Sequence, residues 1–309
     1  MTRRTDLDAT AIVLMVLLCA SWGLQQVAIK VAIDGVSPVA QAGLRSAGAV
    51  VLVWIWARMR GIPLFARDGT LPAGLLAGSM FAIEFALIYW GLEYTNASRG
   101  VVFLYTTPFV VALGAHLLLP GERLRRLQWA GLACAFAGIV LAFGESLTLP
   151  KGREWIGDAM FLGAALLWGG TTLVIRTSRL AGVRATKTLF YQLAVSALGL
   201  PLVALALGES GIVRVTPLIL ASLVYQAVLV AFISYLAWFW LVRHYPAAQL
   251  AAFSFLTPVF GVLAGVMLLG ERLTPALLGA LVLVAIGIRL VNRPARRLSV
   301  SPRSGPGTG

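Results

Sequence analysis

The sequence is poor in charged residues, histidine and cysteine, and these shortages exclude several classes of protein. Charged residues form 12% of the 309 residues, and histidine and cysteine occur twice each. Cys19 and Cys134 lie in apolar runs without a second Cys or His at ligand spacing, so we expect neither a disulfide nor a metal site. No Walker, dinucleotide-glycine, HExxH or GxSxG pattern occurs, and no loop is long enough for a catalytic domain. We therefore expect no cofactor and no enzymatic activity.

Apolar residues, in contrast, are abundant. Hydrophobic residues make up 59% of the chain and the mean hydropathy is +0.88. Soluble domains are about half apolar and about one quarter charged, so this composition indicates an integral membrane protein. The net charge of +13 would suggest nucleic acid in a soluble chain, but no basic stripe with interleaved aromatics follows a polar segment. We expect the basic residues to set membrane topology, with the lipid bilayer and not nucleic acid as partner.

Ten apolar runs are long enough to cross a bilayer as helices. A hydrocarbon core ~30 Å thick needs about 20 helical residues, and none of the runs alternates strictly as a membrane strand does. The first run lacks a small-x-small cleavage site near its end, which favours a retained helix over a signal peptide. The predicted fold is an all-α membrane protein with spans at residues 9–31, 38–58, 70–92, 97–119, 126–143, 155–176, 186–207, 216–242, 247–269 and 275–292.

A repeated pattern divides the chain into two halves. Thr107-Pro108, an apolar run and Gly121-Glu122-Arg123-Leu124 return as Thr257-Pro258, an apolar run and Gly270-Glu271-Arg272-Leu273. Each copy of the pattern occupies about half of the chain, and such internal repeats are typical of membrane transporters. The predicted organisation is a cytoplasmic N-terminus (1–8), a first five-helix repeat (9–143), a linker (144–154), a second, inverted five-helix repeat (155–292) and a disordered cytoplasmic tail (293–309).

Lysine and arginine are unevenly distributed over the predicted loops. Eighteen lie on the side of the N-terminus and six on the opposite side, while Arg45 alone falls well within a span. Because positively charged loops face the cytoplasm, both termini are predicted to be cytoplasmic. The same distribution puts the first Gly-Glu-Arg-Leu loop inside the cell and the second outside, which predicts that the halves are inverted.

Further pairs of matching residues connect the halves. Ser21-Trp22-Gly23 through Lys30 matches Leu167-Trp168-Gly169 through Arg176, so each half begins with a Trp-Gly helix that ends in a basic residue. With Arg45 early in helix two and the Thr-Pro and Gly-Glu-Arg-Leu motifs, the chain resembles the EamA-type drug/metabolite transporters, most of all the bacterial exporters of aromatic amino acids. The resemblance implies a basket-shaped bundle in the bacterial inner membrane. Its central cavity would be lined largely by helices one, three, four, six, eight and nine, with helices five and ten at the periphery.

Polar side chains at membrane depth are costly and normally face other helices or a wet cavity. In helix one, Trp22, Gln25 and Gln26 border one face, which can line a cavity or bond neighbouring helices. In helix six, Trp168 and Thr172 share a face with Thr171 beside them, although threonines often bond only to their own helix. The two indoles could stack on a flat ring and orient a carboxylate, or serve as interfacial anchors.

Glu84 is the only carboxylate clearly in mid-span. It could carry a coupling proton, meet a substrate ammonium group, or act as a protonated structural acid. Its repeat partner is Ser234, so the fold itself does not require an acid at this position. Arg45 could hold a substrate carboxylate or extend its long side chain to water, but structural pairing is favoured. His116 has no partner in the sequence that would indicate a proton relay.

Aromatic and hydroxyl side chains in helices three, four, eight and nine complete the candidate substrate site. They are Tyr89, Tyr105, Tyr225, Tyr235, Trp238 and Ser254. Pro108 and Pro258 lie inside helices four and nine, where proline removes a helical hydrogen bond and bends the helix. These two positions are candidate hinges for alternating closure of the cavity, and fixed kinks are the simpler alternative.

The sequence therefore predicts a secondary transporter that exports small amphipathic metabolites, most of all aromatic or neutral amino acids, by alternating access. Export of cationic drugs or other metabolites is the alternative, with Glu84 as partner of the cation, and an intramembrane enzyme is a remote third. Proton coupling and facilitated diffusion both stay open, and the sequence does not indicate the oligomeric state.

Overall fold

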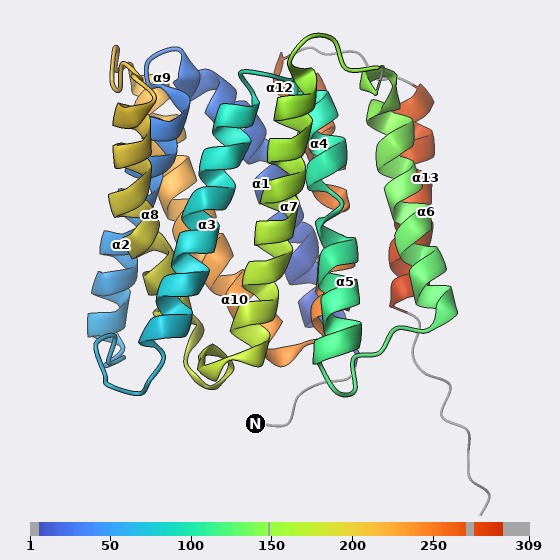
Figure 1. The fold of residues 1–309 in the computed structure, drawn as a ribbon, viewed down its shortest axis with the longest axis horizontal. Coiled ribbons are helices and arrows are strands. Elements are labelled where there is room, and N and C mark those ends of the chain that lie inside the picture. The colour runs from blue at the N-terminus through green and yellow to red at the C-terminus, as the bar shows by residue number, and fades with distance from the viewer. Residues whose placement is uncertain (1–5, 148, 270–274, 293–309) are drawn as a thin grey trace, which may run out of the picture.

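The computed structural model describes residues 6–147, 149–269 and 275–292, which form a bundle of helices packed side by side (Figure 1). Within these residues, nine helices are long and apolar enough to cross a membrane, and the shorter apolar helix Pro275–Val291 makes a tenth crossing. The described residues contain no strand beyond an isolated bridge between Val36 and Ile212. The predicted all-α fold is confirmed.

Ten crossings are built from uninterrupted and broken helices, with ends within two residues of the predicted spans. The uninterrupted ones are α1 (Ala9–Ile33), α2 (Pro38–Met59), α3 (Leu71–Gly91), α6 (Arg126–Phe143), α7 (Glu154–Thr177), α8 (Ala185–Ala206) and α13 (Pro275–Val291). The broken ones are α4 (Ala97–Leu104) with α5 (Thr107–Leu118), and α11 (Ala247–Phe253) with α12 (Leu256–Leu269). The eighth crossing is continuous and consists of α9 (Pro217–Val224), the π-helix η3 (Tyr225–Ser234) and α10 (Tyr235–His244).

The two halves run in opposite directions. Five crossings separate the start of α1 from the start of α7, so α7 begins at the end of the bundle opposite to the N-terminus (Figure 1). The second Gly-Glu-Arg-Leu sequence and the predicted tail lie outside the described residues. Below, the end of the bundle at which α1 begins is called the Glu122 end, and the opposite end is called the Leu92 end.

The doubled Trp-Gly motif has a packing cause. A Cβ atom on Gly23 would lie 2.6 Å from the backbone nitrogen of Gly261 in α12, and one on Gly169 would lie 2.6 Å from Cγ1 of Val110 in α5. Each glycine therefore lets its helix approach a helix of the other half closely. The motif joins the two inverted halves at two equivalent places.

The fourth and ninth crossings are broken just before their prolines. Proline has no N–H to continue the helical ladder, and α5 and α12 begin one and two residues before Pro108 and Pro258 respectively. In the first half, the hydroxyl of Thr107 donates to the carbonyl oxygen of Leu104 at 2.7 Å, which satisfies an acceptor at the end of α4. The expected kinks are thus complete interruptions, and each places a residue between two half-helices next to the bundle centre.

The helices α6 and α13 pack against each other at one edge of the bundle (Figure 1). Neither contributes a side chain to the central cavity described below. This is the peripheral position that the family resemblance implies for helices five and ten.

Candidate functional site

A cavity lies at the centre of the bundle, between the two halves. Its volume is about 160 Å³, close to the roughly 150 Å³ of an engineered cavity that binds benzene. Side chains from α1, α3, α4, α7, α8, α10 and α12 line it, together with Tyr105 between α4 and α5. The cavity is therefore large enough for one aromatic ring without rearrangement.

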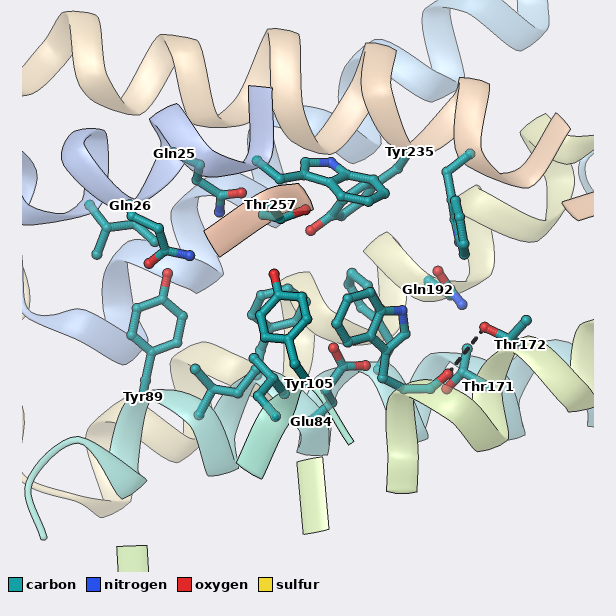
Figure 2. Close-up of a pocket in the computed structure, with 18 of the residues that line it drawn as sticks. Gln25, Gln26, Glu84, Tyr89, Tyr105, Thr171, Thr172, Gln192, Tyr235 and Thr257 are labelled. Carbon is teal, nitrogen blue, oxygen red and sulfur yellow. Dashed lines mark hydrogen bonds between the residues drawn. The ribbon is translucent and has the colours of Figure 1, made fainter. Parts of the chain in front are cut away.

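Eleven of the thirteen side chains predicted for substrate binding line this one cavity. Figure 2 shows Gln25, Gln26 and Tyr89 toward one end, Gln192, Thr171 and Thr172 toward the other, and Glu84, Tyr105 and Thr257 between them. That these residues bind a substrate stays a prediction. The eleven are Trp22, Gln25, Gln26, Glu84, Tyr89, Tyr105, Trp168, Thr171, Thr172, Tyr235 and Trp238.

Tyr225 and Ser254 do not line the cavity, so the structure corrects their predicted position. The hydroxyl of Tyr225 donates to the carbonyl oxygen of Ser21 at 2.9 Å, which joins η3 to α1. The hydroxyl of Ser254 donates to the carbonyl oxygen of Ala251 at 2.7 Å, at the end of α11. Both hydroxyls serve the helical framework.

The two tryptophans of the repeat face the cavity with different neighbours. Trp22 contacts Tyr235 and Trp238 edge to face, and its indole N–H donates to the hydroxyl of Ser234 at 2.8 Å. Trp168 packs edge to face against Tyr105. The N–H of Trp22 is already bonded, so the expected role of both indoles in orienting a carboxylate is wrong for Trp22 in this conformation.

Glu84 points its carboxylate into the cavity from α3 (Figure 2) and is only 5% exposed. Among the described residues it makes no hydrogen bond or ion pair. Arg45 is near enough for electrostatic attraction, but its guanidinium group stacks on the Phe85 ring at 4.1 Å. Glu84 is thus a buried acid whose oxygens are available to a ligand or a proton.

Arg45 is 1% exposed and does not line the cavity, so its side chain does not extend to water, which was the alternative to the favoured structural pairing. None of its guanidinium nitrogens has a hydrogen-bond partner among the described residues. Its guanidinium group lies over the rings of Phe85 and Tyr235, with the Tyr235 centroid at 5.9 Å. The arginine therefore stabilises the wall behind the cavity through cation–π contacts.

The hydroxyls of Thr171 and Thr172, neighbours in α7, differ in their hydrogen bonds. The hydroxyl of Thr172 donates to the carbonyl oxygen of Trp168 at 3.2 Å. This bond within the helix uses the hydrogen that Thr172 could otherwise donate to a ligand. The hydroxyl of Thr171 has no partner among the described residues. Of the two, Thr171 has the free hydrogen-bonding capacity.

Gln192 and Thr257 line the cavity but were not predicted as site residues. Gln192 lies in α8, the seventh crossing, which the resemblance did not include in the cavity lining. Its polar side chain at mid-span was the available signal, although Gln226 carries the same signal and lies away from the cavity. Thr257 differs from its repeat partner Thr107 because its hydroxyl does not bond back to its own helix.

The Glu122 end is closed by a buried cluster that joins both halves. One oxygen of Glu122 accepts a hydrogen bond from Arg176, and the other accepts from the backbone N–H of Ala247 at 2.9 Å. Arg176 also donates to the carbonyl oxygens of Val242 and Tyr245. The first Gly-Glu-Arg-Leu motif is thus bonded to the basic residue that ends the second Trp-Gly helix.

A second cavity of about 330 Å³ lies beside this cluster and is lined by Arg176, Arg243 and His244 among others. Phe239 is the side chain that lines both cavities. At the other extreme, the central cavity reaches Ile29 and Leu92, which lie in the last turn of α1 and just after α3. The central cavity therefore extends to the Leu92 end and is separated from the Glu122 end by Phe239.

Two further polar groups have structural partners. The ring nitrogen Nδ1 of His116 accepts a hydrogen bond from the backbone N–H of Leu124 at 3.1 Å, so it orders the loop after α5. Arg99 forms a buried ion pair with Asp158, with its Nε and Nη2 atoms on the two carboxylate oxygens at 2.7 and 2.5 Å. That pair joins α4 to α7 near the Leu92 end.

Known proteins resemble the chain along nearly its whole length. A "Probable amino-acid metabolite efflux pump" of Escherichia coli (strain K12) is 28% identical over 293 residues, which cover 89% of this chain and 92% of the relative. The protein of the same name from Salmonella typhimurium is 29% identical, with the same coverage. An "Uncharacterized inner membrane transporter YedA" of Escherichia coli (strain K12) is 24% identical over 87% of this chain and 86% of the relative.

A solved crystal structure has the same fold, with a TM-score of 0.81 over 92% of this chain and 96% of that chain at 19% identity. The sequence pattern of the EamA-like transporter family matches the chain twice, over residues 9–144 and 155–293. These names indicate a transporter and not an enzyme. The chain is a multi-pass membrane protein that belongs to the EamA-like transporter family.

Proposed function

We propose that the protein exports aromatic or other neutral amino acids by alternating access. The observation that carries this proposal is a cavity of aromatic-ring size, walled by tryptophan, tyrosine and phenylalanine, into which one unpaired carboxylate points. Aromatic walls favour edge and stacked contacts with a flat side chain. The carboxylate of Glu84 is a partner for the ammonium group of an amino acid.

The names of two relatives support amino acids as the substrate class, without indicating which side chain is preferred. Both are named amino-acid metabolite efflux pumps. A cavity with amide, hydroxyl and carboxylate groups suits a zwitterion with an apolar side chain, because each charged group needs its own hydrogen-bonding partners in a low-dielectric site.

The position of the cavity supports an outward-facing conformation. By the distribution of lysine and arginine, the Glu122 end, where α1 begins and α13 ends, is cytoplasmic. The cavity extends to the opposite end, while Phe239 and the Glu122–Arg176 cluster separate it from the cytoplasm. Opening toward the cytoplasm would require this cluster to separate.

The broken helices at Pro108 and Pro258 are the proposed hinges for that change. Each break lies beside the cavity in equivalent positions of the two halves. Restoring the helical hydrogen bond with Pro108→Ala or Pro258→Ala should slow transport and leave substrate affinity unchanged. Normal transport kinetics in both variants would contradict the hinge role.

Counterflow in liposomes tests the proposed function. Purified protein is reconstituted into vesicles loaded with unlabelled phenylalanine or tryptophan, and uptake of the labelled amino acid is measured against protein-free vesicles. We expect uptake that a panel of neutral amino acids inhibits. Absence of counterflow with every amino acid of the panel would remove this substrate class. An imposed pH gradient in the same vesicles distinguishes proton coupling from facilitated diffusion.

Export of organic cations is a second candidate, and the unpaired Glu84 favours it specifically. A cation would need an acidic partner but no group for a carboxylate. Uptake of a labelled aromatic cation, with no counterflow of amino acids, would support this function. Conversion of a substrate without its translocation would instead indicate an intramembrane enzyme.

A further inference from the structure

Gln192 and Thr171 form an uncharged polar subsite at one end of the cavity. We infer that this subsite binds the carboxylate of the substrate and thereby selects amino acids over amines. The inference rests on the proposed function, because it concerns recognition in the same cavity. It assigns a role to a helix, α8, that neither the repeat motifs nor the expected cavity lining included.

Gln192 is fully buried, and its side chain lines the cavity. Neither its amide nitrogen nor its amide oxygen has a hydrogen-bond partner among the described residues. A buried amide without partners is costly, so such a group in a cavity wall is a place where a ligand gains hydrogen bonds that the protein does not supply.

The hydroxyl of Thr171 is the second unpaired group of the subsite. Its side chain is 4% exposed and lines the same cavity. Figure 2 shows Gln192 and Thr171 toward the same end of the cavity, with Glu84 nearer the centre. The amide of Gln192 in α8 and the hydroxyl of Thr171 in α7 are thus two unpaired polar groups that line the same cavity.

The charges around the cavity decide which ligand group this subsite takes. Glu84 is the acid in the wall and repels a carboxylate, whereas it attracts an ammonium group. Arg45 does not line the cavity, so a carboxylate there has to be held by uncharged donors. The amide of Gln192 and the hydroxyl of Thr171 are such donors, and hydrogen bonds to an ionised acceptor are stronger than neutral ones.

The geometry of an amino acid agrees with this arrangement. Its ammonium and carboxylate groups are attached to the same carbon atom, so their partners must be neighbours. Glu84 and Thr171 lie on the same side of the cavity (Figure 2), and the aromatic walls remain for the side chain.

Gln226 provides a matched control for the test. It is also a fully buried glutamine whose amide atoms have no partner among the described residues, but it does not line the cavity. Gln192→Leu and Gln226→Leu therefore remove the same group from equally buried positions, and only the first touches the proposed subsite.

The experiment measures equilibrium binding of three probes to purified protein: phenylalanine, phenethylamine, which lacks the carboxylate, and 3-phenylpropionate, which lacks the ammonium group. In Gln192→Leu we expect phenylalanine to bind about 10-fold more weakly and phenethylamine to bind as before. Gln192→Glu should weaken the two carboxylate probes further and strengthen phenethylamine. Thr171→Val should act in the same direction as Gln192→Leu, and Gln226→Leu should change none of the affinities.

Equal losses for phenylalanine and phenethylamine in Gln192→Leu, or no loss for either, would overturn the inference. Unchanged phenethylamine binding shows that the variants retain a folded cavity. If wild-type protein fails to bind phenylalanine but binds 3-phenylpropionate in a manner that depends on Gln192, the proposed amino-acid substrate is wrong and the carboxylate subsite stands. If it binds neither carboxylate probe, the subsite is overturned.

Discussion

The central cavity and the cluster at the Glu122 end contain the same kinds of buried polar groups, but the two regions differ in whether these groups have hydrogen-bond partners. In the cluster, both oxygens of Glu122 accept hydrogen bonds, and both terminal nitrogens of Arg176 donate them. In the cavity, Glu84, Gln192 and Thr171 have no such partners among the described residues. Both regions are buried, so exposure to solvent does not explain the difference.

Hydrogen-bond partners within the protein distinguish polar groups that stabilise the fold from those that are available to a ligand. A buried polar group that has partners stabilises the fold, and removal of one partner leaves the other unsatisfied. An uncharged buried polar group without hydrogen-bond partners has no hydrogen bond to lose, so its removal costs little. Variants in the cluster should therefore change stability, whereas variants in the cavity should change ligand binding.

Breaking the ion pair of the cluster should give the largest effect. Arg176→Gln removes the ion pair with Glu122 and the hydrogen bonds to the carbonyl oxygens of Val242 and Tyr245, and we expect a loss of about 3–5 kcal/mol in the free energy of unfolding. Thermal unfolding in detergent measures the change. Lys187→Gln is the comparison variant, because the side chain of its partner Asp68 is 35% exposed, so solvent weakens that ion pair and we expect a smaller loss of stability. An equal effect of both variants would contradict the structural role of the cluster.

Two buried serines give a smaller and sharper contrast. Ser234 accepts the indole N–H of Trp22, so Ser234→Ala should leave that donor unsatisfied and lower stability by about 1–3 kcal/mol. The hydroxyl of Ser196 is equally buried and has no partner among the described residues, so Ser196→Ala should be neutral or slightly stabilising. The same unfolding measurement compares the two, and a loss from Ser196→Ala as large as that from Ser234→Ala would refute the distinction.

The smallest expected effect is a pH dependence at the loop between α2 and α3. The hydrogen bond from Lys187 at 2.8 Å, helped by the hydroxyl of Thr70, lowers the pKa of the Asp68 carboxyl from 3.8 to about 2. A lowered pKa in the folded state stabilises the fold above pH 3.8, and this contribution is lost as the pH falls toward 2. In Asp68→Asn the acid-side loss of stability should be shallower than in wild-type protein, and identical pH profiles would show that the pair contributes nothing.

Much of the fold could be predicted from the sequence, because membrane helices are specified by long apolar runs and the inversion by the loop charges. The breaks before Pro108 and Pro258 were predicted only as kinks. A proline in the sequence indicates that one helical hydrogen bond is missing, but not whether the helix bends or is interrupted. The pairing of Glu122 with Arg176 depends on contacts between the halves, which neither motif specifies by itself.

Some of the residues that line the cavity could be predicted from the sequence and others could not. Helical spacing identified the face of Trp22 and Gln25, and depth in the membrane identified Glu84, because both depend on local geometry. The positions of Tyr225 and Gln192 depend on the rotation of each helix about its axis, and the π-helix η3 alters that rotation in the eighth crossing. A polar residue at mid-span therefore did not by itself indicate which side chains reach the cavity.

The most direct test of this account is the thermal unfolding of Glu84→Gln with and without phenylalanine. We predict that the variant without ligand unfolds at the wild-type temperature or slightly above, because the Glu84 carboxylate makes no hydrogen bond among the described residues that the substitution would remove. Phenylalanine should raise the unfolding temperature of the wild-type protein through preferential binding to the folded state, and this rise should be lost in the variant. A ligand-free destabilisation as large as that of Arg176→Gln, or an unchanged response to phenylalanine, would contradict the assignment of Glu84 to the substrate.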